Sequence, residues 1–139
     1  MSFLLDTNVV SEWVKPRPNP GVIGWLADVD EDHAFISVIT MAELRRGIGR
    51  MQDGIRKQRL AAWLASDLPL RFEGRIVPIN ATIADTWGRI TARGEIAGRP
   101  IGAMDALIAA TAIARSLTLV TRNVRDFQSS LNAIVNPWI

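Results

Sequence analysis

The segment Ile101–Ala114, IGAMDALIAATAIA, constrains the fold more than any other part of the chain. It is apolar on nearly every side of a helix, and helices of that kind are buried. One carboxylate, Asp105, lies in the first turn of this predicted helix. Burying an ionised carboxylate without a partner is costly, so such a group is normally paired or neutralised. We therefore expect Asp105 to line a cleft in which other groups compensate its charge.

The rest of the chain alternates between predicted strands and predicted helices. Short apolar runs bounded by turn residues indicate strands at Ser2–Leu5, His33–Ile39, Arg75–Ile79, Leu117–Thr121 and Ala133–Val135. Periodic or capped segments indicate helices at Val9–Val14, Pro20–Val29, Thr40–Met51, Ile55–Ser66, Ala81–Ile96 and Ile101–Ala114, with a short turn after Asn123. Pro78 indicates that its strand lies at a sheet edge or ends there. This alternation predicts a three-layer α/β/α sandwich around a mostly parallel sheet.

Composition excludes several classes of site. The chain has 139 residues, a formal net charge of +2, no cysteine and a single histidine, His33. Disulfides, thiolate metal sites, two-histidine nuclease chemistry and most zinc hydrolase sites are therefore excluded. No apolar run reaches the ~18 residues that a transmembrane helix needs, and the opening MSFLLDTN lacks the basic region of a signal peptide. We expect one cytoplasmic domain that does not bind a membrane.

Polar side chains follow several of the predicted strands. Asp6 ends the first strand, Glu43 lies in the first helical turn after the second, and Asn123 and Asp126 follow the fourth. Ligands of open parallel sheets bind beyond the carboxyl ends of the strands, where these residues and Asp105 are expected to converge. Crowded carboxylates repel one another, and Mg²⁺ or Mn²⁺ relieves that repulsion. An all-acid site without histidine or cysteine favours metal-assisted phosphodiester hydrolysis.

Each of these residues also has a purely structural interpretation. Asp6 is a typical turn residue, and Thr40 with Glu43 has the spacing of a capping box. Asp105 complements the dipole of its helix, but the gain of roughly 0.3–1 kcal/mol is too small to offset full burial. Asn123 and Asp126 have the spacing of a helix cap and its third residue.

Five motifs in this order carry a family resemblance. They are LLDTNVVSE at 4–12, S-x-I-T-x-A-E-L-R-x-G at 37–47, D-A-x-I-A-A-T-A at 105–112, T-R-N-x-x-D-F at 121–127 and NPW at 136–138. Together they resemble the PIN-domain toxins of the VapC type, particularly the FitB-like branch, over essentially the whole chain. The resemblance implies a metal-dependent endoribonuclease, the toxin of a type II toxin-antitoxin system. It also implies homodimers and a VapB-like antitoxin that blocks the site, with DNA bound only indirectly through that antitoxin.

The resemblance also implies roles for single residues. Asp6, Glu43 and Asp105 match the three acids that hold the metal in this family. Many members have aspartate where this chain has Asn123, and Asp126 is the nearby acid that can replace it. Thr7 and Thr121 are expected to hold water or to orient the acids.

We expect a single PIN domain over 1–139. The two successive helices at about 40–66 have the length of helix pairs that form an arm packed on another chain, and Trp63 on this arm is the expected contact with a dimer partner or the antitoxin. Basic side chains cluster on this arm: Arg45, Arg46, Arg50, Arg56, Lys57 and Arg59. A solvated face and an RNA-backbone contact are both open interpretations of this cluster. Arg122 and Arg125 lie closer to the expected cleft and are the better candidates for RNA contacts.

Two other functions compete with the nuclease interpretation. One is a catalytically weak PIN-like binding module that acts mainly in an antitoxin–operator DNA complex, and Asn123 keeps that alternative open. The other is a haloacid-dehalogenase-like phosphatase, because Asp6 and Thr7 follow a strand. That family needs a second aspartate two residues after the first, where this chain has Asn8.

Overall fold

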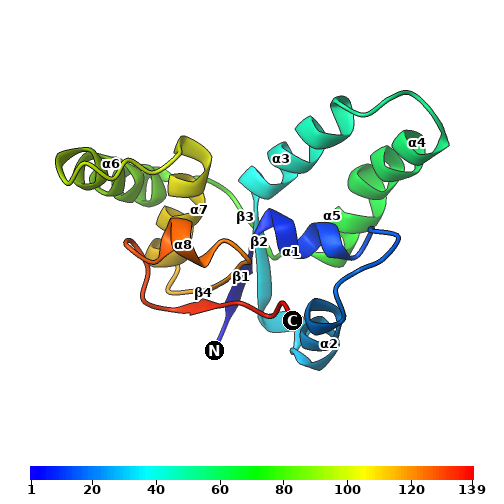
Figure 1. Cartoon of the computed structure of the whole chain (residues 1–139), viewed down its shortest axis with the longest axis horizontal. Helices are drawn as coiled ribbons and strands as arrows, with labels where there is room; N and C mark the ends of the chain where they lie inside the picture. The colour runs from blue at the N-terminus through cyan, green and yellow to red at the C-terminus, as the bar shows by residue number, and fades with distance from the viewer.

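A computed structural model of residues 1–139 contains one five-stranded sheet in which every neighbouring pair is parallel (Figure 1). The strand order is β3-β2-β1-β4-β5, with β1 at Phe3–Leu5, β2 at Ala34–Ser37, β3 at Ile76–Val77, β4 at Thr118–Val120 and β5 at Ile134–Val135. The predicted α/β class is confirmed, and the sheet is wholly rather than mostly parallel. The strand that precedes Pro78 lies at an edge, as the proline indicated.

The helices follow the predicted order, with several different bounds. They are α1 (Thr7–Glu12), α2 (Pro20–Asp28), the 3₁₀ turn η1 (Glu31–His33), α3 (Val38–Gly49), α4 (Ile55–Ala62), the π turn η2 (Trp63–Asp67), α5 (Leu68–Arg71), α6 (Ala81–Ile96), α7 (Ala103–Ala114) and α8 (Val124–Phe127). The single helix predicted at 55–66 is instead three consecutive helical segments. The backbone stays in the right-handed helical conformation at both junctions, and Pro69, which has no N–H to donate, lies in the first turn of α5 directly after the π turn.

Alternating strand residues divide the interior into two cores, one on each face of the sheet. Leu4 and Leu119 face the core made with α6, α7 and α8, whereas Leu5 and Val120 face the core made with α1, α2, α3 and α5. All four side chains are fully buried. Two apolar layers on either side of one sheet are the predicted three-layer sandwich.

The apolar helix predicted at Ile101–Ala114 is buried in the structure as α7. Six of its residues are buried, namely Ala106, Ile108, Ala109, Ala110, Thr111 and Ala112. Asp105 precedes them and is only partly buried, because the first turn of α7 emerges at the edge of the domain. Because Asp105 lies at the start of the buried helix α7, the position of its backbone is fixed relative to the sheet.

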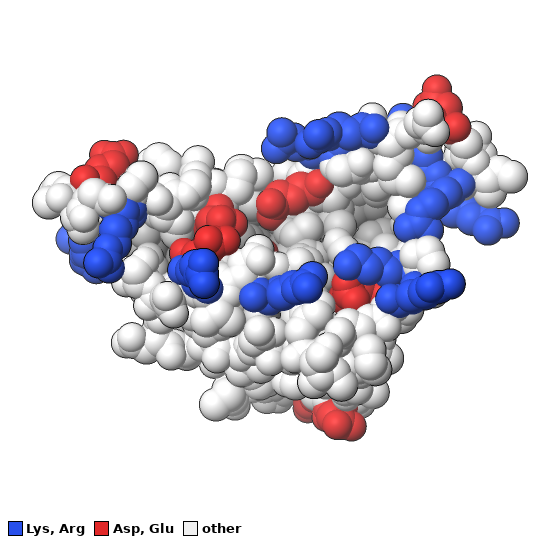
Figure 2. Space-filling model, in the orientation of Figure 1, with Lys and Arg blue, Asp and Glu red and all other residues white.

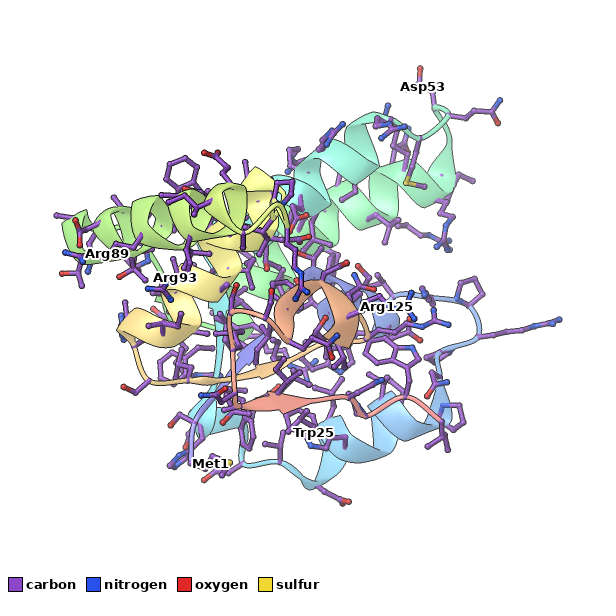
Figure 3. The ribbon with its side chains drawn as sticks, turned by 60° about the vertical axis from the view of Figure 1, so that its left-hand side comes forward. Met1, Trp25, Asp53, Arg89, Arg93 and Arg125 are labelled. Atoms are coloured by element: carbon purple, nitrogen blue, oxygen red, sulfur yellow. The ribbon has the colours of Figure 1, made fainter.

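Helices α3 and α4 extend away from the rest of the molecule, and their connection carries Asp53 at its tip (Figures 1 and 3). No side chain of α4 is buried, and in η2 only Leu64 is buried. This region corresponds to the arm predicted at about 40–66, whose contact with another chain stays a prediction. No helix in the structure has both the length and the apolar character needed to cross a membrane.

Candidate active site

Asp6 lies where β1 ends and α1 begins, and the residue is only 5% exposed. Its Oδ1 accepts a hydrogen bond of 2.8 Å from the Thr7 N–H, and its Oδ2 accepts one of 2.8 Å from Thr121 Oγ1. Asp6 is therefore the N-cap of α1, which begins at Thr7 rather than at the predicted Val9. Capping uses one carboxylate oxygen, while the second is held by the residue that follows β4.

Burial raises the pKa of Asp6 to about 6, despite the opposing hydrogen bonds from Thr121 and Thr7. The negative charges of Glu43 and Asp105 raise this pKa further. The carboxylates of three separate elements thus act on one another, although they are remote in sequence.

Glu43 does not close the capping box that its spacing with Thr40 indicated, and that interpretation is wrong. The N-cap of α3 is Ser37, whose Oγ accepts a hydrogen bond of 3.0 Å from the Ile39 N–H. Because α3 begins at Val38, Thr40 lies inside the first turn and cannot cap it. Glu43 Oε1 instead accepts a 2.7 Å hydrogen bond from Thr7 Oγ1. This bond directs Glu43 toward the start of α1.

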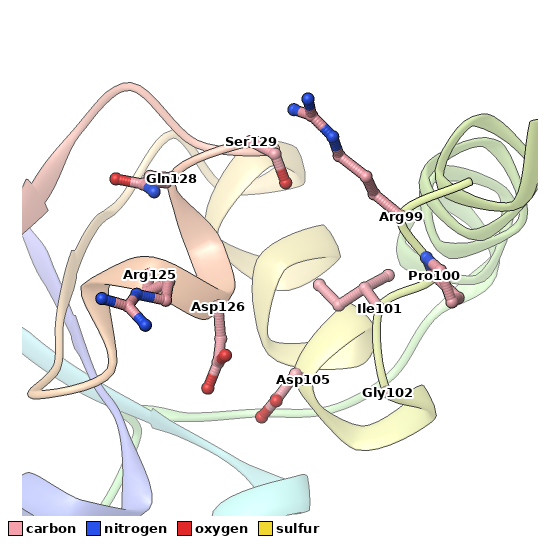
Figure 4. A pocket seen from close by; sticks show the side chains of 9 residues that line it. All are labelled: Arg99, Pro100, Ile101, Gly102, Asp105, Arg125, Asp126, Gln128 and Ser129. Carbon is pink, nitrogen blue, oxygen red and sulfur yellow. The ribbon is translucent and has the colours of Figure 1, made fainter. Parts of the chain in front are cut away.

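Asp105 lies in the first turn of α7 and forms neither a hydrogen bond nor an ion pair through its side chain. Partial burial raises the pKa of Asp105, and the negative charges of Asp126 and Glu43 raise it further. Figure 4 shows the carboxylates of Asp105 and Asp126 near each other at the same end of the cavity that both residues line. Asp105 thus faces acids from two different elements.

Asn123 and Asp126 are both exposed and belong to the segment after β4. Asn123 occupies the N-cap position of α8, but its side chain makes no capping hydrogen bond, so the predicted side-chain cap is wrong. Its backbone N–H donates a 3.0 Å hydrogen bond to Thr121 Oγ1. Of the two residues, Asp126 is the one whose charge acts on Asp105.

Thr121 joins the ends of β1 and β4. Its hydroxyl donates to Asp6 and accepts a hydrogen bond of 3.3 Å from Asn8 Nδ2, besides the one from Asn123. Thr121 is fully buried, so this arrangement has little freedom. Thr7 and Thr121 hold two of the acids through neutral donors, which agrees with the expected orienting role. The part that Asn8 takes in this network was not predicted.

The acids of this edge are not neutralised by basic side chains. None of Asp6, Glu43, Asp105 and Asp126 is in an ion pair. No three carboxylates approach closely enough to surround one ion. Figure 2 shows acidic side chains beside α3 and beside α7 and α8, on a face where basic side chains lie around them. An open set of uncompensated carboxylates fits a hard, hydrated cation, which binds few protein oxygens and keeps several waters.

Two hollows adjoin this edge, and the acids are divided between them. A cavity of about 470 Å³ is lined by Asp105 and Asp126, and a hollow of about 260 Å³ is lined by Thr7 and Glu43. The larger cavity also has Arg125 on its wall, as its place in the sequence indicated, whereas Arg122 stacks 5.9 Å from the Trp138 ring.

The larger cavity also contains residues that sequence reasoning missed: Arg99, Gln128 and Ser129. They lie in loops or at a helix end, without a periodic pattern that marks them. Their proximity to Asp105 depends on how α6 and α8 pack against α7.

Comparison with known proteins identifies the family that this fold and acidic edge define. The PIN domain model matches residues 3–129, and the chain belongs to the PIN-domain family. Toxin FitB of Neisseria gonorrhoeae is 38% identical over 136 residues, which cover 98% of both proteins. VapC ribonuclease Y4jK of Sinorhizobium fredii is 33% identical over 98% of this chain and 97% of its own length.

A solved structure gives the same result in three dimensions. The structure of FitAB bound to an IR36 DNA fragment contains a chain with a TM-score of 0.91 and 36% identity, covering 99% of this chain and 96% of that one. The resemblance to PIN-domain toxins of the VapC type, including FitB, is thereby confirmed. The fold predicted for that family is confirmed with it.

Proposed function

We propose that this chain is a metal-dependent endoribonuclease, the toxin of a type II toxin-antitoxin system, which hydrolyses RNA phosphodiester bonds in the cytoplasm with Mg²⁺ or Mn²⁺. The observation that carries the proposal is the uncompensated acidic edge of the sheet. Four carboxylates influence one another there without a basic partner. The names of the relatives, a toxin and a ribonuclease, support the same activity.

We assign Asp6, Glu43 and Asp105 to the metal, which would bind some of these acids through its own waters, because no three carboxylates surround one ion directly. When bound, a divalent ion at such a site stabilises the negative charge that develops on the attacked phosphate. Neutral hydroxyl donors position two of the acids without cancelling their charge, since Thr121 binds Asp6 and Thr7 binds Glu43. Positioned but unneutralised acids are what a cation-dependent site requires.

We assign the fourth acidic role to Asp126 rather than to Asn123. Asp126 lines the same cavity as Asp105, and its charge raises the pKa of Asp105. The Asn123 side chain is an exposed amide that makes no hydrogen bond within the chain. Asn123 therefore contributes chiefly through its backbone N–H, which fixes Thr121.

A VapB-like antitoxin and a second copy of the chain are the proposed protein partners. Trp63 lines the 260 Å³ hollow together with Glu43 and Thr7, so a partner segment bound there covers an acid of the proposed site. The FitAB structure with DNA supports an assembly that includes DNA, which we expect to be bound through the antitoxin.

The test is cleavage of a structured RNA pool by the purified chain freed from any antitoxin, with Mg²⁺, Mn²⁺ or EDTA. We expect cleavage only with a metal ion. Asp105→Asn should reduce the rate by more than about 100-fold, because residues that merely orient metal ligands already change activity about 10- to 100-fold. Asp126→Asn should reduce the rate more than Asn123→Ala does. Full activity of Asp105→Asn would refute the assignment of that residue.

The second candidate function is a binding module that acts in an antitoxin–operator complex without cleaving RNA. The neutral Asn123, at a position where the family resemblance implies an acid, is the observation that favours it. This function predicts tight antitoxin binding by a folded chain that neither cleaves RNA nor binds divalent ions. Isothermal titration of the chain with Mg²⁺ and Mn²⁺ separates the two functions.

A further inference from the structure

The cavity beside Asp105 contains polar side chains that the fold itself does not use. Its polar lining side chains form no hydrogen bond and no ion pair within the chain: Arg99, Asp105, Arg125, Asp126, Gln128 and Ser129. Only one lining residue is hydrophobic. Its volume of about 470 Å³ lies within the roughly 300–1,000 Å³ of typical ligand sites, but its lining is far more polar. This combination indicates a polar, charged ligand.

A second hollow of about 220 Å³ continues from this cavity. The two share Arg99, Ile101 and Ser129, and the second adds Arg93 from α6 and Ser130. Figure 4 shows Arg99 extending near Ser129, while Asp105 and Asp126 lie at the other end of the cavity. We call the path from Asp126 past Arg99 to Arg93 the α6–α7 groove.

Arg93 and Arg99 in this groove have no acidic partner, in contrast to Arg89, which lies on α6 like Arg93. Arg89 is in an ion pair with Asp85, at 2.9 Å between Nε and Oδ2. Arg93 and Arg99 are exposed and have no acidic partner within the chain. Two unpaired cations thus follow one another along a groove that starts at the acids.

We propose that the α6–α7 groove binds the backbone of single-stranded RNA on one side of the cleaved bond, with successive phosphates at Arg99 and Arg93. The proposal rests on the ribonuclease activity proposed above. Grooves that bind single strands without sequence preference combine a line of positive charge with stacking platforms. This groove has the charge but no aromatic side chain in its lining. It therefore contributes affinity that depends on phosphate and salt rather than on base identity.

The first experiment measures binding of short single-stranded RNAs of different sequence to Asp105→Asn, which prevents cleavage during the measurement. Removing one arginine–phosphate interaction lowers the slope of log affinity against log salt by about 0.7 for a single strand. The loss of affinity caused by Arg99→Gln should therefore be about fivefold larger at 0.1 M salt than at 1 M salt. Arg93→Gln should do the same, and the loss of affinity should be equal for all sequences. Arg89→Gln is the matched control and should leave the slope unchanged.

A gain-of-charge variant tests the path from the opposite direction. Ser129 is exposed and lines both hollows, so Ser129→Arg should steepen the salt dependence and strengthen RNA binding. An unchanged salt slope in all three groove variants would overturn the proposal.

Steady-state cleavage distinguishes this proposal from the proposed function. If the chain cleaves RNA, Arg99→Gln and Arg93→Gln should raise KM several-fold with kcat nearly unchanged. Cleavage by the wild type with the same KM in both variants would overturn the groove while leaving the nuclease function intact. A chain that neither cleaves nor binds RNA would overturn both.

Discussion

Replacing Asp6 with asparagine should change stability in opposite directions at low and neutral pH. Burial, together with the charges of Glu43 and Asp105, raises the pKa of Asp6 in the folded chain to about 6 from an ordinary value of 3.8. Each unit of that difference corresponds to about 1.4 kcal/mol. The ionised Asp6 therefore lowers the free energy of unfolding by about 3 kcal/mol above pH 6, when no metal is bound.

The direction in which stability changes with pH follows from proton binding. Between pH 3.8 and 6 the folded chain keeps the Asp6 proton that the unfolded chain has released, so stability decreases as the pH rises. Asparagine removes this titration. It also weakens the hydrogen bond from Thr121 to Oδ2, at a cost of about 1 kcal/mol at every pH. The variant should thus be less stable than the wild type at pH 4, and more stable by about 2 kcal/mol at pH 7.5.

Urea unfolding of both proteins in EDTA, at half-unit steps from pH 4 to 8, provides the measurement. Only the difference between the two free energies of unfolding matters, because the titrating groups that do not interact with Asp6 then cancel. We expect that difference to rise by about 2–3 kcal/mol and to level off above pH 6.5. A difference that is independent of pH would refute the description of Asp6 as a buried carboxylate repelled by neighbouring acids.

Three further predictions concern the metal, one hydroxyl and two glycines. Mg²⁺ at 100 times its Kd should stabilise the wild type by about 2.7 kcal/mol in thermal unfolding, and EDTA should reverse this stabilisation. The same concentration of Mg²⁺ should stabilise Glu43→Gln much less. Thr7→Val removes the donor to Glu43 and should cost about 1 kcal/mol in urea unfolding, with a larger proportional loss in RNA cleavage rate. Gly21→Ala should lower the free energy of unfolding in urea, because its Cβ would lie 2.3 Å from the Pro137 carbonyl oxygen. Gly24→Ala, whose Cβ would meet nothing within 4 Å, should raise that free energy by about 0.5–1 kcal/mol.

The main features of the fold could be predicted from residue patterns alone. The all-round apolar character of Ile101–Ala114 predicted a buried helix, and α7 is that helix. Short apolar runs separated by helices predicted a parallel sheet, because parallel strands need crossover connections. The bounds of α6 agree with the predicted Ala81–Ile96, because the asparagine before the helix, Asn80, is a strong N-cap and the segment that follows is long and periodic.

The capping of α3 shows where local patterns fail. Ser37 and Thr40 are both acceptable N-caps, and only the second has a glutamate three residues later. The choice depends on where β2 ends, and β2 ends at Ser37 because that residue pairs with Val77 of the edge strand. A pairing between segments about 40 residues apart leaves no mark on the sequence around Thr40. For the same reason the sequence did not indicate that Arg99 lines the groove, because its place there is set by the loop between α6 and α7.

Glu12 shows that this chain buries carboxylates in two different ways, with and without a cationic partner. Glu12 is 2% exposed, and burial by itself would raise its pKa. The Lys15 ammonium and the Asn19 N–H outweigh burial, so the pKa of Glu12 is lowered and the acid serves only the turn between α1 and α2. Asp6, in the same chain, is held by hydroxyl and amide donors without a cation, and its pKa is raised instead.

This contrast gives a physical criterion for the site. A cation within the chain would stabilise the fold at the acidic edge, as Lys15 does for Glu12, but it would also occupy the position that a metal ion needs. The nearby arginines do not neutralise the acids, since Arg122 stacks on Trp138 and neither Arg99 nor Arg125 pairs with Asp105 or Asp126. The ionised Asp6 has no cationic partner and lowers the free energy of unfolding, but its charge is free to interact with a metal ion. Binding of Mg²⁺ should restore part of that lost stability.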